Sequence, residues 1–73
     1  MNTTLTAVIE REDDLYVALC PEFDVVSQGA SVREARENLR EALELFFEEA
    51  PPEEQERRYR PEVYVTNLNI ALG

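Results

Sequence analysis

Apolar and polar residues alternate along the first part of the chain with the period of two that is typical of half-buried β-strands. This pattern predicts strands at residues 5–9, 15–20 and 23–28, the last closed by a glycine. Residues 10–14 are all charged and predict a hairpin turn between the first two strands. Pro21 ends the second strand or marks a bulge in it, because proline has no N–H to donate to a neighbouring strand. Three antiparallel strands therefore open the chain.

The pattern then changes to helical spacing, which predicts an amphipathic helix over Val32–Glu49. Ser31 and Glu34 form the S-x-x-E capping box, in which each side chain satisfies a free backbone N–H at the helix start. The Pro51-Pro52 pair ends the helix. Residues 51–61 are polar and bounded by proline, and predict a flexible loop. The apolar face comprises Val32, Ala35, Leu39, Ala42, Leu43, Phe46 and Ala50.

Residues 63–72 alternate again and predict a fourth strand, and residues 63–73 carry no charge. The element order is β-β-β-α-β, an α+β fold in a single domain over residues 1–73. A right-handed crossover returns the last strand beside the first. We therefore expect a four-stranded, mainly antiparallel sheet in the order 3-2-1-4, with the helix on one face.

The fourth strand would lie at the edge of this sheet, where a long uncharged strand is a template for pairing with another chain. We expect homo-oligomers that pair through Val63, Val65, Leu68 and Ile70. A chain of 73 residues buries little apolar surface, so oligomerisation would add stability. The alternative is a shorter strand whose C-terminal half packs under the helix.

Net charge is -9, from 16 acidic and 7 basic residues. This surface repels phosphate backbones, so we expect no direct contact with nucleic acid. It attracts a basic protein partner, although acidic charge also simply keeps a small protein soluble. The one basic cluster, Arg57, Arg58 and Arg60 around Tyr59, either contacts RNA or balances the neighbouring glutamates.

Candidate chemistry is sparse, because the chain has no histidine and a single cysteine in an apolar strand. The acidic cluster Glu10, Glu12, Asp13 and Asp14 is either a divalent-cation site or, as we expect, a solvated hairpin tip. Glu22 with Asp24 is a minimal metal or hydrolytic pair. We expect no catalytic, cofactor or metal site. No apolar run is long enough to span a membrane and the start lacks a signal-peptide pattern, so the expected location is the cytoplasm.

The segment 5–49 resembles the HicB-like antitoxin N-terminal domain, and the resemblance depends on the combination of several short motifs. They are Tyr16-Val17-Ala18, Cys20-Pro21-Glu22, Gln28-Gly29, Ser31, Glu34-Ala35, Asn38-Leu39 and Glu41-Ala42. The resemblance implies a partial ribonuclease-H-like fold. It further implies a binding module without enzymatic activity, which holds a small, basic, RNA-cleaving toxin of the HicA type inactive.

On this resemblance we expect Pro21, Glu22, Phe23 and Asp24 to contact the partner. We expect a solitary domain, without the DNA-binding domain with which such antitoxins usually continue. The alternative function is a solitary homo-oligomeric module that binds a small ligand or a divalent metal through its carboxylates.

Overall fold

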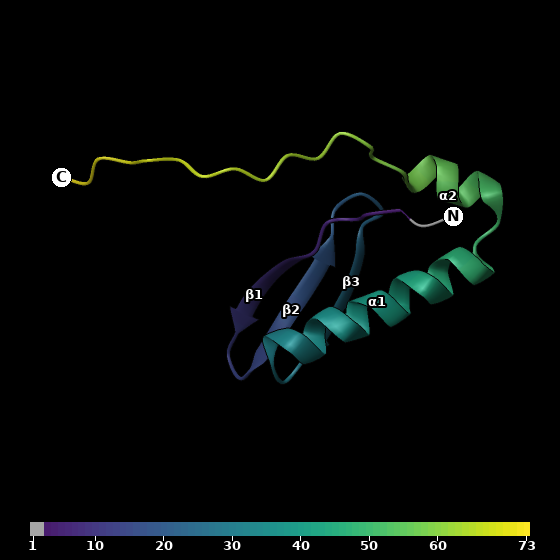
Figure 1. Ribbon diagram of the computed structural model, residues 1–73, viewed down its shortest axis with the longest axis horizontal. Helices are drawn as coiled ribbons and strands as arrows, with labels where there is room; N and C mark the ends of the chain where they lie inside the picture. Colours follow the sequence, from purple (N-terminus) through teal and green to yellow (C-terminus); the bar gives the residue numbers. More distant parts are fainter. Residues whose placement is uncertain (1–2) are drawn as a thin grey trace.

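The computed structural model describes residues 3–73 and places five elements along the chain (Figure 1). Three strands come first, and two helices follow. The elements are β1 (Val8–Glu12), β2 (Leu15–Cys20), β3 (Val25–Gly29), α1 (Val32–Glu49) and α2 (Pro52–Arg58). The ranges of β2 and α1 are those predicted from the sequence.

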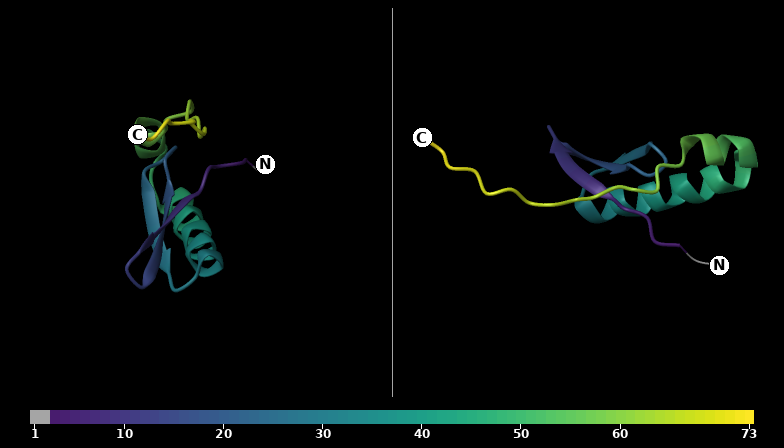
Figure 2. Two further views of the ribbon diagram at one scale, coloured as in Figure 1. Left: turned by 90° about the vertical axis from the view of Figure 1, so that its left-hand side faces the viewer. Right: turned by 90° about the horizontal axis from the view of Figure 1, so that it is seen from above.

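The three strands form one antiparallel sheet with β2 in the middle. The register places Ala18 opposite Ile9 on one side and opposite Ser27 on the other. Helix α1 covers one face of this sheet and leaves the other open (Figure 2). The buried apolar core lies between α1 and the sheet, and consists of Ala18, Cys20, Phe23, Ala35 and Leu39. The open face carries a cross-strand row of Val8, Leu19 and Val26.

The start of α1 confirms the predicted capping box. The Ser31 hydroxyl accepts a hydrogen bond from the Glu34 N–H at 3.1 Å. The Glu34 carboxylate reaches back and accepts from the N–H of Ala30 at 3.2 Å, one residue before the cap. The first contact satisfies an N–H that the first helical turn leaves free, whereas the second satisfies the N–H of Ala30, one residue earlier than the capping box predicts. The chain therefore enters α1 directly from β3, with two residues between them.

Gly29 allows this close approach between β3 and α1. A Cβ atom at this position would lie 2.5 Å from the backbone nitrogen of Ala35 and 2.8 Å from the carbonyl carbon of Glu34. These neighbours are helix backbone and cannot rotate away. Glycine is needed here for packing, not for a special backbone conformation.

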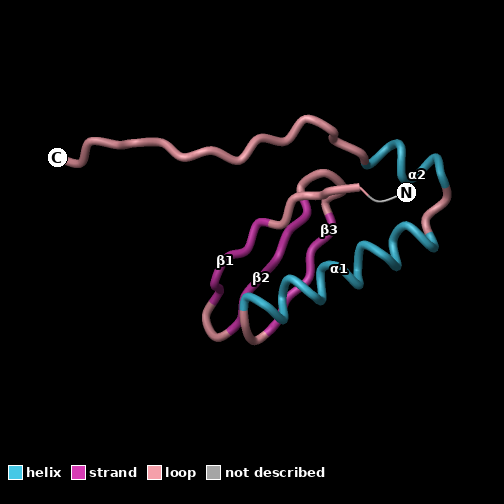
Figure 3. Tube along the Cα trace, viewed as in Figure 1, coloured by secondary structure: helices cyan, strands magenta, loops and turns pink. Residues whose placement is uncertain are grey.

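The expected fourth strand is absent from residues 3–73, and the predicted four-stranded sheet in the order 3-2-1-4 is wrong. Residues 59–73 have no regular secondary structure and extend away from the sheet (Figure 3). The crossover rule assumes that the last strand returns to its own sheet. Here the backbone N–H of Arg60 instead bonds the carbonyl of Glu22, so the chain is fixed at the β2–β3 turn before the uncharged segment begins.

The expected flexible loop 51–61 contains helix α2. Pro52 suits the first helical turn because its missing N–H would have no partner there. Acidic residues in the first turn and arginines in the last complement the helix dipole. The Gln55 side-chain amide donates to the carbonyls of Phe47 (3.2 Å) and Ala50 (2.9 Å), which fixes α2 against the end of α1. The sequence prediction of a loop relied on the flanking prolines and did not consider these features.

Both ends of the first and third strands also differ from the prediction, which placed them at residues 5–9 and 23–28, whereas the strands are Val8–Glu12 and Val25–Gly29. The first strand continues through the charged residues to Glu12, and the turn tightens to Asp13 and Asp14. The third strand begins at Val25, after a turn in which Asp24 has a positive φ of 55°. Asp13 has a similar φ of 54°. Aspartate tolerates this left-handed conformation better than most residues, so charge at these two positions is compatible with tight turns.

We predict that Gly29→Ala lowers the free energy of unfolding by about 1–3 kcal/mol, because the added methyl group forces α1 away from β3. Denaturant unfolding followed by circular dichroism measures the change. Gln28→Ala is the matched control, since its side chain is exposed, and it should change stability by less than about 0.5 kcal/mol. Equal stability of Gly29→Ala and the wild type would contradict the close packing of β3 on α1.

Candidate functional site

The β2–β3 turn (residues 21–24) holds a buried carboxylate. Glu22 is 8% exposed and is the only buried polar or charged side chain in residues 3–73. Its two oxygens accept from the backbone N–H of Thr6 at 3.1 and 3.2 Å, and one accepts from the Thr6 hydroxyl at 2.6 Å. The Cys20 thiol donates at 3.4 Å. The carboxylate is thus fully engaged within the chain, and it fastens the N-terminal segment to the turn.

The hydrogen bonds and the burial of Glu22 have opposite effects on its pKa. Burial is the largest single influence and raises it, whereas the bonds from the side chain and backbone of Thr6 lower it. The hydrogen bond from Cys20 lowers it by a smaller amount. Together the hydrogen bonds outweigh burial, so the pKa of Glu22 lies below the usual value of a glutamate. Burial also raises the pKa of the Cys20 thiol, so this cysteine is a core residue and a poor nucleophile.

Phe23, the next residue in the turn, is the centre of an aromatic cluster. It is 7% exposed, and its ring centroid lies 5.6 Å from that of Phe46 and 4.9 Å from that of Phe47, both on α1. The ring of Tyr59 stacks on Phe23 at 5.0 Å with an interplanar angle of 16°. Such pairs contribute about 0.5–1.5 kcal/mol each beyond the area they bury. Phe23 therefore joins α1 to the end of α2.

The carbonyls of the same turn bind the last residue of α2, Arg58, and Arg60 just beyond it. The backbone N–H of Arg60 donates to the carbonyl of Glu22 at 2.8 Å. The Arg58 guanidinium donates to the carbonyl of Asp24 at 2.7 Å and lies 4.9 Å from the ring centre of Phe46. The position at which the C-terminal segment leaves the body is consequently set by the turn.

The four residues expected to contact a partner thus divide into two groups. Glu22 and Phe23 are buried and bind other parts of the chain, whereas Asp24 is exposed and Pro21 is half-buried. What the turn offers to a partner is the Asp24 carboxylate and one face of the proline. The signal for the internal role of Glu22 was weak, since Thr6 is 16 residues away in the sequence.

The other charged clusters behave as surface groups. Residues 10–14 are exposed as expected, but residues 10–12 lie in β1 and only Asp13 and Asp14 form the hairpin turn. No group of three or more histidine, cysteine or acidic side chains within residues 3–73 has the arrangement of a metal site. In the basic cluster, Arg57 pairs with Glu54 at 3.0 Å and Arg58 binds the turn. Charge balance with a neighbouring glutamate is thus seen for Arg57, whereas Arg58 binds a backbone carbonyl.

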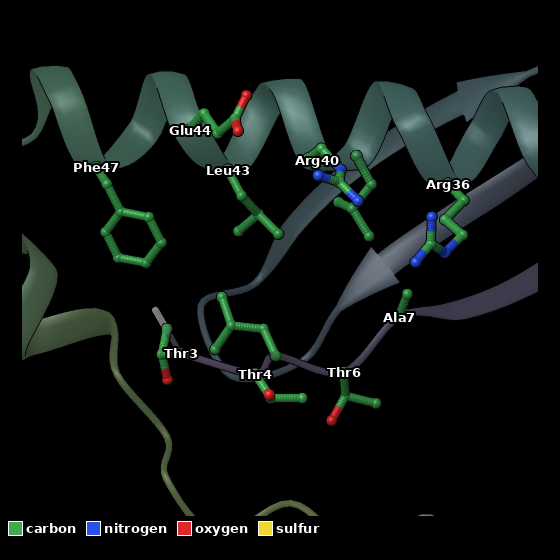
Figure 4. A pocket seen from close by; sticks show the side chains of 11 residues that line it. Thr3, Thr4, Thr6, Ala7, Arg36, Arg40, Leu43, Glu44 and Phe47 are labelled. Atoms are coloured by element: carbon green, nitrogen blue, oxygen red, sulfur yellow. The ribbon is translucent and has the colours of Figure 1, made fainter. Parts of the chain in front are cut away.

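An open hollow lies between residues 3–7 and helix α1, and we call it the α1 groove (Figure 4). Its volume is about 660 Å³. Leu43 and Phe47 lie on the side of α1 that faces Thr3 and Thr4. The complete lining is Thr3, Thr4, Leu5, Thr6, Ala7, Arg36, Leu39, Arg40, Leu43, Glu44 and Phe47. Sequence reasoning did not identify this groove, although the spacing of four from Leu39 to Leu43 to Phe47 indicates a continuous apolar ridge.

The uncharged C-terminal segment, residues 63–72, makes no strand and exposes most of its apolar side chains. The exposed fraction is 84% for Tyr64, 79% for Leu68 and 91% for Leu72. Of the residues expected to form an oligomer edge, Val65, Leu68 and Ile70 are exposed and Val63 is half-buried. A protein surface rarely leaves so many neighbouring apolar side chains in water without a partner.

Similarity to known proteins extends over almost the whole chain. A UPF0150 protein of Helicobacter pylori (strain J99 / ATCC 700824) is 39% identical over 70 residues, which cover 94% of this chain and 97% of that protein. A UPF0150 protein of Synechocystis sp. (strain ATCC 27184 / PCC 6803 / Kazusa) is 41% identical over 51 residues, covering 67% and 71%. No family model and no solved structure matches the chain. In residues 3–73 neither helix has the length and apolar character needed to cross a bilayer.

We predict that Glu22→Gln lowers the free energy of unfolding at neutral pH by about 1–3 kcal/mol, because the amide cannot accept all the hydrogen bonds that the carboxylate accepts. The folded-state pKa is lowered, so the stabilisation is complete above the ordinary pKa of glutamate, about 4.3, and is lost as the pH falls through the folded-state value. The stability difference between wild type and variant should therefore shrink on acidification.

Denaturant unfolding at a series of pH values measures this difference. Glu41→Gln, on the exposed side of α1, is the matched control and should leave the pH profile of stability nearly unchanged. A Glu22→Gln protein as stable as the wild type at neutral pH would contradict the role of the carboxylate.

Proposed function

Since the chain belongs to the UPF0150 family, we propose that it is a non-enzymatic protein-binding module of that family. Its partner would be a small, basic, RNA-cleaving protein of the HicA type, which it neutralises in the cytoplasm as a HicB-type antitoxin does. The proposal combines the resemblance of residues 5–49 to the HicB-like domain with the distribution of charge on the surface.

The surface charge is the observation that carries the proposal. Glu22 is the single carboxylate in residues 3–73 that is buried, so nearly all of the net charge of -9 lies on the surface. Exposed acids follow one side of α1 at Glu37, Glu41, Glu44 and Glu48. A field of one sign speeds the encounter with a partner of opposite charge and rejects partners of like charge. A basic protein fits this surface, and a nucleic acid does not.

Several residues of the HicB-like pattern have structural roles in this chain, which supports a shared scaffold. Glu22 binds Thr6 of the N-terminal segment, Gly29 allows α1 to pack closely on β3, and Ser31 caps the start of α1. The partner contacts would then fall on exposed residues around this scaffold. Within the β2–β3 turn, the available carboxylate is that of Asp24.

The absence of enzymatic activity is supported by the state of the reactive groups that the chain does contain. It has no histidine, the usual general base at neutral pH. The Cys20 thiol is buried with a raised pKa, and the Glu22 carboxylate is occupied by hydrogen bonds from Thr6. The exposed carboxylates suit electrostatic recognition.

The test uses the product of a neighbouring reading frame, chosen for being short and basic, and measures its cleavage of RNA. Addition of the UPF0150 chain at an equimolar ratio should abolish this cleavage. Raised salt should weaken the inhibition because the attraction between exposed charges is screened. Cleavage that continues unchanged at equimolar and higher ratios would overturn the proposal.

A pair of matched variants tests the location of the contact. Asp24→Asn removes one charge from the β2–β3 turn and is compatible with the positive φ. We predict that it weakens binding about 2- to 5-fold, the range expected for an exposed ion pair. Asp13→Asn makes the same change at an almost identical φ, at the other end of β2, and should leave the affinity nearly unchanged. Equal effects of the two variants would rule out contact through the β2–β3 turn.

A further inference from the structure

We propose that two copies of this chain exchange their C-terminal segments, each segment lying in the α1 groove of the other copy. The contact is between chains and leaves the three-stranded sheet of each chain as described. It does not depend on toxin binding. In the described residues 3–73, residues 64–72 are all exposed, and the groove formed by residues 3–7 with α1 is open.

The first argument is surface area. The accessible surface is 6237 Å², whereas a folded monomer of 8.4 kDa is expected to expose about 4,600 Å². The excess of about 1,600 Å² per chain would give a dimer interface of about 3,200 Å² in total, within the range of obligate homodimers. The radius of gyration of 14.3 Å likewise exceeds the value of about 11 Å expected for this length.

The second argument is the composition of the segment. Two copies with a net charge of -9 repel each other, and residues 63–73 are the one long stretch that brings no charge into a contact. In an extended backbone, side chains alternate between two sides. Tyr64, Leu68, Ile70 and Leu72 then share one side with Thr66, and Asn67 and Asn69 share the other with Val63, Val65 and Ala71. The four large apolar side chains of the first side suit a groove, and the two asparagines make the second side more polar.

The groove matches such an occupant. Its apolar lining comes from Leu5, Leu39, Leu43 and Phe47. Its polar lining comes from Arg36, Arg40 and Glu44 of α1 and from the threonines of residues 3–6. Figure 4 shows Leu43 and Phe47 on the side of α1 that faces residues 3–7, and both also pack against the core. An apolar centre with a polar rim is the usual composition of a protein interface. β1 is also an edge strand of the sheet, which leaves it open to backbone pairing.

The point and direction in which the segment leaves the folded body favour the groove of a second copy over the chain's own groove. The hydrogen bond from Arg60 to Glu22 and the stacking of Tyr59 on Phe23 hold the chain just before the segment. From there it runs out beyond the sheet, along the 50 Å axis of the molecule (Figures 1 and 2). Reciprocal exchange of such a segment closes with two-fold symmetry and buries both segments at once.

The test is the molar mass in solution, measured by light scattering during size-exclusion chromatography. We expect the wild type to be a dimer and Leu68→Glu with Ile70→Glu to be a monomer. Asn67→Glu with Asn69→Glu is the matched control, because it adds the same charge on the other side of the segment and should remain a dimer. A monomeric wild type, or a Leu68→Glu with Ile70→Glu variant that stays dimeric, would overturn the proposal.

A mixing experiment tests the groove itself. Ala7→Glu places a charge in the groove at an exposed position, so the variant should fold yet be monomeric. Mixed with Leu68→Glu plus Ile70→Glu, it should form a heterodimer, because one intact segment then meets one intact groove. Val26→Glu, on the open face of the sheet, should remain a dimer. Failure of the mixture to associate, or dissociation by Val26→Glu instead of Ala7→Glu, would overturn the assignment of the groove.

Discussion

The interaction on which the rest of this structure depends is the set of hydrogen bonds between Thr6 and the buried carboxylate of Glu22. A buried charge is costly unless it is fully bonded, and Thr6 supplies both its N–H and its hydroxyl. In return, the carboxylate holds residues 3–7 near α1, where they form one wall of the α1 groove. The same residue binds Arg60 through its carbonyl. Glu22 therefore positions both the groove and the origin of the C-terminal segment.

Phe23 complements this polar connection with an apolar one. Its contacts with Phe46, Phe47 and Tyr59 join α1 to the end of α2 around one buried ring. The turn that the HicB-like resemblance marks as a partner contact is thus largely an internal fastening. In the function that we propose, recognition depends on charge on the surface, and in the assembly that we propose, the contact is made by the uncharged segment that follows the turn-bound residues. The β2–β3 turn therefore serves to position other parts of the chain.

The sequence predicted the parts of the fold that depend on neighbouring residues. The ranges of β2 and α1 and the Ser31 cap follow from periodicity and from one short motif. The pairing of Thr6 with Glu22 and the stacking of Tyr59 on Phe23 join residues 16 and 36 positions apart, which no local pattern reveals. The error over residues 63–72 has a physical reason. Alternation identifies a segment that needs a partner, but it does not say whether that partner lies in the same chain.

The most direct test of this account is amide hydrogen exchange of Thr6 and Arg60 in the folded protein, measured by nuclear magnetic resonance. Both N–H groups bond Glu22, one to its carboxylate and the other to its carbonyl. The account predicts that both exchange far more slowly than in an unstructured peptide, although neither lies in a strand or a helix. Exchange of both amides at the rate of an unstructured peptide would contradict the central role of Glu22.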